Sequence, residues 1–253
     1  MSVESATATE AVAGVATEGA PEPETACAPC ADGQVGQVLA SRSSFYRMLA
    51  SLYFSTLTPE QVESFAEADL SPYAQLGDEF ADGINDITRY LRKRNTGTRD
   101  ELAADFTGTF VGTKAYEGKV AVPYESVFTS EDGLLCRESY HEVFHEYRRE
   151  AVRRAPGVDW PDDHLSFMFE FMAILSDRAA RSLEAGDVAA ARHDVEESAA
   201  FLDRHILSWF DDFAELAGRI VETRFYRGVL KITRGFLELD RETLADLAEQ
   251  VCA

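Results

Sequence analysis

Hydrophobic positions recur at intervals of three and four residues along almost the whole chain after an N-terminal stretch. In residues 38–54, for example, Phe45, Leu49, Leu52 and Tyr53 follow this spacing. Such a pattern places the large apolar side chains on one face of an α-helix. Residues 38–54 are therefore predicted to form an amphipathic helix.

Helix start signals agree with the periodicity. Thr58 precedes Pro59 and lies three residues before Gln61, which is the arrangement of a capping box with proline at the first helical position. Thr98 begins a similar signal. Further helices are predicted over residues 76–94, 99–111, 137–154, 162–184, 187–204, 208–222, 225–238 and 240–250.

No alternating apolar run that would indicate a β-strand is bounded by turn residues. The pattern predicts an all-α fold, a single helical-bundle domain of about nine to eleven helices. Residues 166–180 are apolar on nearly all sides, as in a central helix. The long connection at residues 112–133 has no periodicity, and long loops of this kind are usually functional or mobile.

The first 36 residues contain six acidic side chains and no Lys or Arg, and otherwise consist mainly of small or polar residues and proline. Such a segment buries too little apolar surface to fold. We expect a disordered acidic tail over residues 1–36 and one all-helical domain over residues 37–253. Cys27 and Cys30 lie in the tail without the second cysteine pair of a structural zinc site, so both are expected to be free thiols.

The charge of the chain limits its partners. The 45 acidic and 24 basic residues give a formal net charge of −21, and removing the six acids of the tail leaves 39 acids and 24 bases, or −15. This balance argues against nucleic-acid binding, which depends on Lys and Arg. The first residues show no positively charged stretch before an apolar one, and no apolar run is long enough to span a bilayer. We expect a cytoplasmic protein with no stable membrane insertion.

One short motif suggests a metal enzyme. His141, Glu142 and His145 form a His-Glu-x-x-His pattern on a predicted helix, where two imidazoles on one face can bind zinc and the glutamate can act as general base. A catalytic zinc needs a third protein ligand, and the metzincin continuation fails at Arg148 and Ala151. A zinc-dependent hydrolase is one alternative function, and two solvated histidines are the simpler explanation.

Several longer segments together resemble one family, the TorD/DmsD-type chaperones of redox enzyme maturation. The similar segments, in the family's order, are residues 45–54, 104–112, 122–128, 161–164, 205–209 and 225–230. Residues 161–164, Pro-Asp-Asp-His, are similar to the family's Glu-Pro-x-Asp-His signature. Trp160 stands where that signature has Glu, so this chain departs from the signature at the position of an acidic side chain.

The resemblance implies a cytoplasmic chaperone without catalytic activity and without a metal or cofactor of its own. Such chaperones bind the twin-arginine leader and the apo form of a molybdopterin-containing oxidoreductase of the dimethyl-sulfoxide reductase type. They assist cofactor insertion and delay export until the enzyme is mature. The chain would be a monomer or a helix-swapped dimer. A non-catalytic subunit of an oxidoreductase complex is the second alternative.

A twin-arginine leader is an apolar segment preceded by two guanidinium groups, which carboxylates accept in bidentate fashion. A receptor therefore needs an aromatic groove with an acid at one end. Asp163 is the candidate guanidinium acceptor, and His164 could hydrogen-bond to the peptide backbone or sense pH. Core packing is the simpler explanation for Phe106 and Phe110, which lie four residues apart on one helix face. The predicted leader-binding residues are Phe106, Phe110, Pro123, Tyr124, Ser126, Phe128, Asp163 and His164.

Overall fold

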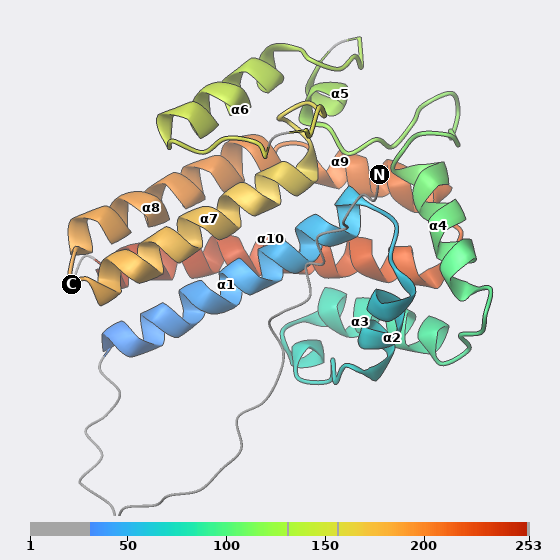
Figure 1. Cartoon of the computed structure of the whole chain (residues 1–253), viewed down its shortest axis with the longest axis horizontal. Coiled ribbons are helices and arrows are strands. Elements are labelled where there is room, and N and C mark those ends of the chain that lie inside the picture. The colour runs from blue at the N-terminus through green and yellow to red at the C-terminus, as the bar shows by residue number, and fades with distance from the viewer. Residues whose placement is uncertain (1–30, 131, 156, 252–253) are drawn as a thin grey trace, which may run out of the picture.

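The computed structural model describes residues 31–130, 132–155 and 157–251, which form ten α-helices and no strand (Figure 1). The helices are α1 (Ala31–Phe54), α2 (Pro59–Glu67), α3 (Asp78–Leu91), α4 (Thr98–Thr109), α5 (Glu125–Thr129), α6 (Glu138–Arg149), α7 (Leu165–Glu184), α8 (Val188–Phe201), α9 (Phe210–Ile220) and α10 (Arg224–Val251). A 3₁₀ turn, η1, spans Tyr73–Gln75, and a π-helical turn, η2, spans Leu202–Ile206. The all-α prediction is confirmed.

Four long helices form the centre of the bundle. α1 packs along α7, α7 along α8, and α10 against both α8 and α3 (Figure 1). In Figure 1, α5 and α6 lie above α7 and α8, whereas α2 and α3 lie below α10. None of the described helices is both long enough and apolar enough to cross a bilayer.

A buried polar network crosses the bundle between α1, α7 and α10. The Arg42 guanidinium donates to Asp240 Oδ1 at 2.5 Å and to Ser176 Oγ at 2.8 Å. Tyr46 donates its hydroxyl proton to Asp240 Oδ2 at 2.6 Å. All four side chains are buried, so each charge or dipole depends on its partner rather than on water.

The first helix begins earlier than the sequence predicted. α1 starts at Ala31, inside the stretch expected to be a disordered tail, and Val35 is buried against the core. Val35 lies four residues before Leu39, so it extends the apolar stripe of the helix by one turn. Residues 1–30, with Cys27 and Cys30, lie outside the described part of the chain.

Two other boundaries differ from the predictions. The two helices predicted over residues 225–238 and 240–250 are a single helix, α10, because no glycine or proline interrupts this stretch after Gly235 and Asp240 is held by Arg42. The connection at residues 112–133 was predicted to be irregular, but it contains the short helix α5.

Candidate functional site

The long connection and the start of α7 are joined by backbone hydrogen bonds. Leu165 N donates to Pro123 O at 2.9 Å, and Glu125 N donates to Asp163 O at 3.1 Å. Between these bonds Tyr124 and His164 form an isolated antiparallel bridge. The structure therefore brings together residues 123–126 and 163–164, which the sequence analysis had assigned to one site from two separate motifs.

Asp163 lies at the centre of this junction. Its carboxylate Oδ2 accepts a hydrogen bond from Ser126 N at 2.9 Å. Burial raises the pKa of Asp163, and the hydrogen bond from the Ser126 backbone N–H opposes that rise. Asp163 Oδ1 and Ser126 Oγ are both buried without a hydrogen-bond partner. Asp163 thus holds the connection in place with one oxygen and keeps acceptor capacity on the other.

His164 is buried and neutral. Its Nδ1 accepts a hydrogen bond from Ser166 N at 3.1 Å, which caps the first turn of α7. Burial lowers the pKa of His164 to about 3. The imidazole therefore does not change its charge near neutral pH, and the suggestion that His164 senses pH in that range is wrong.

Aromatic rings surround His164 and continue to the protein surface. Trp160 lies 4.9 Å from His164 and 5.2 Å from Phe54 between ring centroids, and Phe54 lies 6.0 Å from Phe167. Tyr124 lies 4.8 Å from His164, again between ring centroids. Trp160 is 37% exposed and Phe54 is 36% exposed. We call Phe54, Tyr124, Trp160 and Phe167 the aromatic surface.

Two members of the aromatic surface, Phe54 and Phe167, were not predicted from the sequence. Phe54 ends the first helix, and its exposure could not be read from a periodicity that also places Leu52 and Tyr53 in the core. Phe167 lies in a stretch that is apolar on nearly all sides, so the periodicity does not show that its side chain is only partly buried. Trp160 was noticed only as a departure from the family signature.

The remaining predicted residues lie deeper in the protein. Phe106 and Phe110 are buried in the core, with ring centroids 5.4 Å apart, and Phe110 lies 5.4 Å from Tyr53. Phe128 is half-buried and stacks on Trp209 at 5.5 Å. Phe106 and Phe110 are therefore part of the core, in contact with Tyr226, and do not join the aromatic surface.

A second buried pair fixes the position of α5. Glu125 lies 3.1 Å from His205, measured from Oε2 to Nδ1, and both side chains are buried. Burial raises the pKa of Glu125, and the hydrogen bond with His205 opposes the rise. No short-range pattern links residues 80 positions apart, so this contact could not be predicted from the sequence.

The His-Glu-x-x-His motif lies on α6, and His141, Glu142 and His145 are all exposed. The single group of described residues with a geometry suited to a metal ion lies elsewhere. Within the described residues the motif therefore has no third ligand, which a zinc hydrolase requires.

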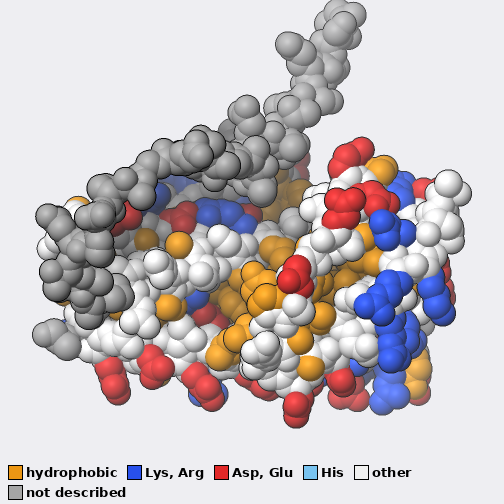
Figure 2. Space-filling view, turned by 90° about the horizontal axis from the view of Figure 1, so that it is seen from below, with side chains coloured by type: hydrophobic (Ala, Val, Ile, Leu, Met, Phe, Trp, Pro, Cys, Tyr) orange, Lys and Arg blue, Asp and Glu red, His pale blue; other side chains and the backbone are white. Residues whose placement is uncertain are grey.

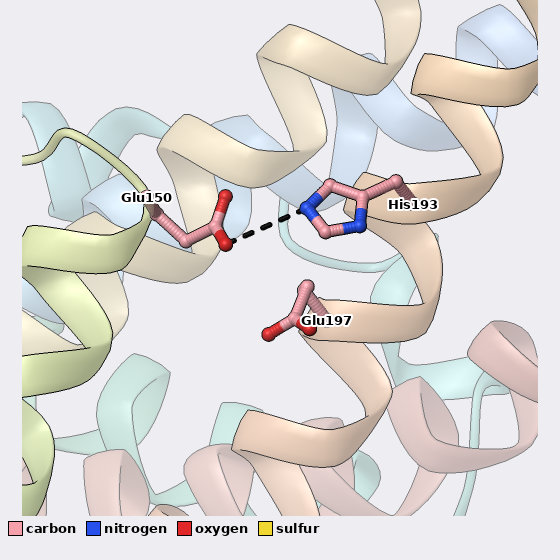
Figure 3. A group of neighbouring side chains, drawn as sticks. All are labelled: Glu150, His193 and Glu197. Atoms are coloured by element: carbon pink, nitrogen blue, oxygen red, sulfur yellow. Dashed lines mark ion pairs between the residues drawn. The ribbon is translucent and has the colours of Figure 1, made fainter.

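That group joins the end of α6 to α8 (Figure 3). Glu150 points toward His193, with Oε1 and Nε2 3.5 Å apart, and Glu197 lies one helical turn from His193. Arg178 already donates to Glu150 at 3.1 Å, and Arg149 pairs with Glu197. A cation would have to displace these guanidinium groups, so we interpret the group as an ion-pair network that ties α6 to α7 and α8.

Comparisons with known proteins agree with the family resemblance seen in the sequence. The model of a family described as nitrate reductase delta subunit matches residues 73–215. The chaperone protein TorD of Vibrio vulnificus strain YJ016 is 26% identical over 211 residues, which cover 80% of this chain and 94% of the relative. TorD of Vibrio cholerae serotype O1 strain M66-2 is 24% identical over 216 residues, covering 83% and 94%. TorD of Aliivibrio fischeri strain ATCC 700601 / ES114 is 25% identical over 210 residues, covering 81% and 94%.

Proposed function

Because the chain belongs to the family of the nitrate reductase delta subunit and the TorD-type chaperones, we propose that it is a cytoplasmic chaperone for a molybdenum-containing oxidoreductase. The family expected from the sequence is confirmed. The relatives are chaperones by name, which supports a binding function without catalytic turnover. In this proposal the chain binds the twin-arginine leader and the apo form of its client, assists cofactor insertion and delays export.

The observation that carries the leader-binding proposal is the aromatic surface beside the buried carboxylate of Asp163. Exposed aromatic rings in a cluster provide the apolar contact area that dominates peptide recognition. The face of the Trp160 ring can also stack on a guanidinium group, an attraction of about 0.5–1 kcal/mol at an exposed site. Trp160 would then contact a leader arginine in the place where the family signature has a carboxylate.

A titration with a synthetic twin-arginine leader tests the proposal. The wild-type chain is expected to bind the leader, and replacing both leader arginines with alanine should weaken the affinity by about tenfold or more. Trp160→Ala should weaken binding by a similar factor, because it removes both the apolar contact and the stacking. Tyr116→Ala is the matched control, since Tyr116 is 41% exposed and lies outside the aromatic surface. If neither leader binds at tens of micromolar and low salt, the proposal fails.

The role of Asp163 needs a conservative variant. Asp163→Ala would remove a buried hydrogen bond to Ser126 and would destabilise the junction itself. Asp163→Asn keeps the size of the side chain and an acceptor oxygen, but removes the charge. The Asn variant should unfold close to the wild-type temperature and bind the leader more weakly. Wild-type affinity in a folded Asp163→Asn protein would show that Asp163 is outside the binding site.

The family description also names a subunit, which makes a permanent subunit of an oxidoreductase the second candidate. Purification of the mature client separates the two functions. A chaperone leaves the enzyme once the cofactor is loaded, whereas a subunit stays in equal amount with the active enzyme. We expect the chain in the apoenzyme fraction and not in the mature one.

A further inference from the structure

Trp160 lies in a segment that has no regular secondary structure of its own. The described residues from 151 to 161, between α6 and α7, lie in turns, a bend and irregular backbone. The Trp160 ring is partly exposed, so packing against neighbours does not enclose it on all sides. Its indole N–H donates no hydrogen bond to any described residue. The position of the ring therefore depends on what holds the backbone beneath it.

Arg154 holds this backbone with one guanidinium group. Its Nε pairs with Asp162 Oδ1 at 2.6 Å. Its Nη1 donates to Val158 O at 3.2 Å and to the carbonyl oxygen of Trp160 itself. A guanidinium group is a planar fork of donors, so it can keep several acceptors in one fixed arrangement. Arg154 thus ties together the residues before, at and after Trp160.

Asp162 connects this arrangement to the helices of the bundle. Its side chain is buried, and its backbone O accepts a hydrogen bond from the Tyr147 hydroxyl of α6 at 3.3 Å. Tyr147 in turn lies 4.8 Å from Phe171 of α7 between ring centroids. Burial raises the pKa of Asp162, and the charge of Arg154 opposes that rise. The segment is therefore fixed to α6 and α7 through Arg154 and Asp162.

We propose that Arg154 is a positioning residue of the leader site, which holds Trp160 where its ring can contact a leader arginine. This role rests on the proposed function, because the contact between the leader and Trp160 belongs to that function. A binding site loses affinity when the groups that support its contact residues let them move. Asp162 fills the variable position of the family signature, between Pro161 and Asp163, so its pairing with Arg154 is not part of that signature.

The simpler explanation is that Arg154 only stabilises the fold. In that case, replacing Arg154 would lower the free energy of unfolding but would leave the Trp160 ring and the leader affinity unchanged. Arg153 is the matched control. It is the same residue type one position earlier, is exposed and forms no ion pair with any described residue. Arg153→Met removes the same charge as Arg154→Met without touching the contacts to Trp160.

Fluorine NMR of the full chain labelled with fluorotryptophan follows the ring with no leader present. The sequence contains two tryptophans, so two signals are expected, and Trp160→Phe assigns them. Trp209 is buried and donates its indole N–H to His205 O at 2.6 Å, so its signal reports whether the core is intact. Arg154→Met should shift or broaden the Trp160 signal and leave the Trp209 signal in place. Arg153→Met should change neither signal.

Arg154→Lys is the conservative variant. Lysine keeps a positive charge beside the buried Asp162 carboxylate, but a single ammonium group does not reproduce the planar fork that also holds the two carbonyl groups. The Trp160 signal should therefore move in the same direction as in Arg154→Met, and by less. If the Trp160 signal stays at its wild-type position in both variants, Arg154 does not position the ring and the proposal is wrong.

The Trp160 signal also shows where the leader binds. The molecule has a wide apolar groove between α1, α2, α3 and α10, and Figure 2 shows hydrophobic side chains gathered at the centre of that face. Neither Phe54 nor Trp160 lines this groove. Adding the twin-arginine leader should shift the Trp160 signal. A leader that binds without shifting it would be held elsewhere, which would refute the role of Arg154 and leave leader binding itself standing.

Leader titrations test whether Arg154 acts through Trp160. Arg154→Met should weaken the leader affinity by about fivefold, less than Trp160→Ala, because the ring is still present but less well placed. In a Trp160→Ala background the same substitution should weaken it by about 1.5-fold or less, since the ring that Arg154 positions is already absent. Arg153→Met should leave the affinity unchanged. Equal losses in both backgrounds would overturn this role alone, whereas a wild-type chain that binds no leader would overturn the proposed function as well.

Discussion

The buried imidazole of His164 makes folding dependent on pH. Its pKa is about 3 in the folded chain because of burial, against 6.5 for an exposed histidine. Between these two values the unfolded chain binds a proton at this side chain and the folded chain does not. The contribution of the neutral His164 side chain to the free energy of unfolding is therefore complete above pH 6.5. It is lost as the pH falls toward 3.

Replacing His164 should reduce this acid sensitivity. In His164→Asn the amide oxygen can still accept the hydrogen bond from Ser166 N, but the side chain no longer titrates. Between about pH 7 and pH 5, the free energy of unfolding should fall by about 2 kcal/mol more in the wild type than in the variant. Urea unfolding at the two pH values measures the difference. Asp163 and Glu125 have raised pKa values, so they stabilise the folded chain as the pH falls, which is opposite to the effect of His164. Both proteins contain these two carboxyl groups, so their effect cancels in the comparison.

The buried pair of Arg42 and Asp240 gives a prediction about stability. Arg42→Met leaves the Asp240 carboxylate buried without its guanidinium partner and should cost about 3–5 kcal/mol in urea unfolding. Adding Asp240→Leu should recover part of the loss, since both charges are then absent. Arg47→Met serves as the control: Arg47 pairs with Asp177 at the surface, so its loss should cost less than about 1 kcal/mol.

At the level of elements, α3 and α10 pack closely because each has a glycine at the contact. A Cβ on Gly83 would lie 2.7 Å from Gly228 O, and a Cβ on Gly228 would lie 2.5 Å from Gly83 O. Both distances are too short for real atoms, and the obstacle is backbone rather than a flexible side chain. The two helices must therefore separate if either glycine gains a side chain.

Gly228→Ala should lower the free energy of unfolding by about 1–3 kcal/mol, because the helices are forced apart. Gly218→Ala in α9 is the control, since Gly218 is exposed and nothing lies within 4 Å of its position. There the higher helix propensity of alanine should stabilise the protein by about 0.5–1 kcal/mol. Thermal unfolding followed by circular dichroism compares the two variants. A Gly228→Ala variant that unfolds at the wild-type temperature would contradict the close packing of α3 and α10.

The sequence predicted helices well where amphipathic spacing and caps coincide, as at Thr58 before α2. It did not predict the continuity of α10, because no local pattern shows that Arg42, 198 positions away, holds Asp240. The same limit applies to the site. The motifs at residues 122–128 and 161–164 identified the junction, but which aromatic rings reach the surface depends on packing between distant segments.

At the scale of the whole molecule, the net charge of −21 should act on the rate of leader binding. A negatively charged protein attracts two guanidinium groups over distances longer than any contact, and dissolved salt screens that attraction. Raising the ionic strength from about 0.02 M to about 0.5 M should slow association of the twin-arginine leader by about tenfold. The dissociation rate should change much less, since short-range contacts with the aromatic surface determine it.

Stopped-flow fluorescence with two leader peptides measures this effect. The first peptide carries the two arginines, and the second carries glutamine at both positions. Only the first should show an association rate that falls steeply with salt, because the second brings little charge for the protein to attract. The double variant Glu60→Gln with Glu67→Gln should make the association rate slightly less dependent on salt, since long-range attraction is summed over all the acids. Its dissociation rate should be unchanged. Equal salt slopes for the two peptides would mean that the charge of the protein does not guide the leader to its site.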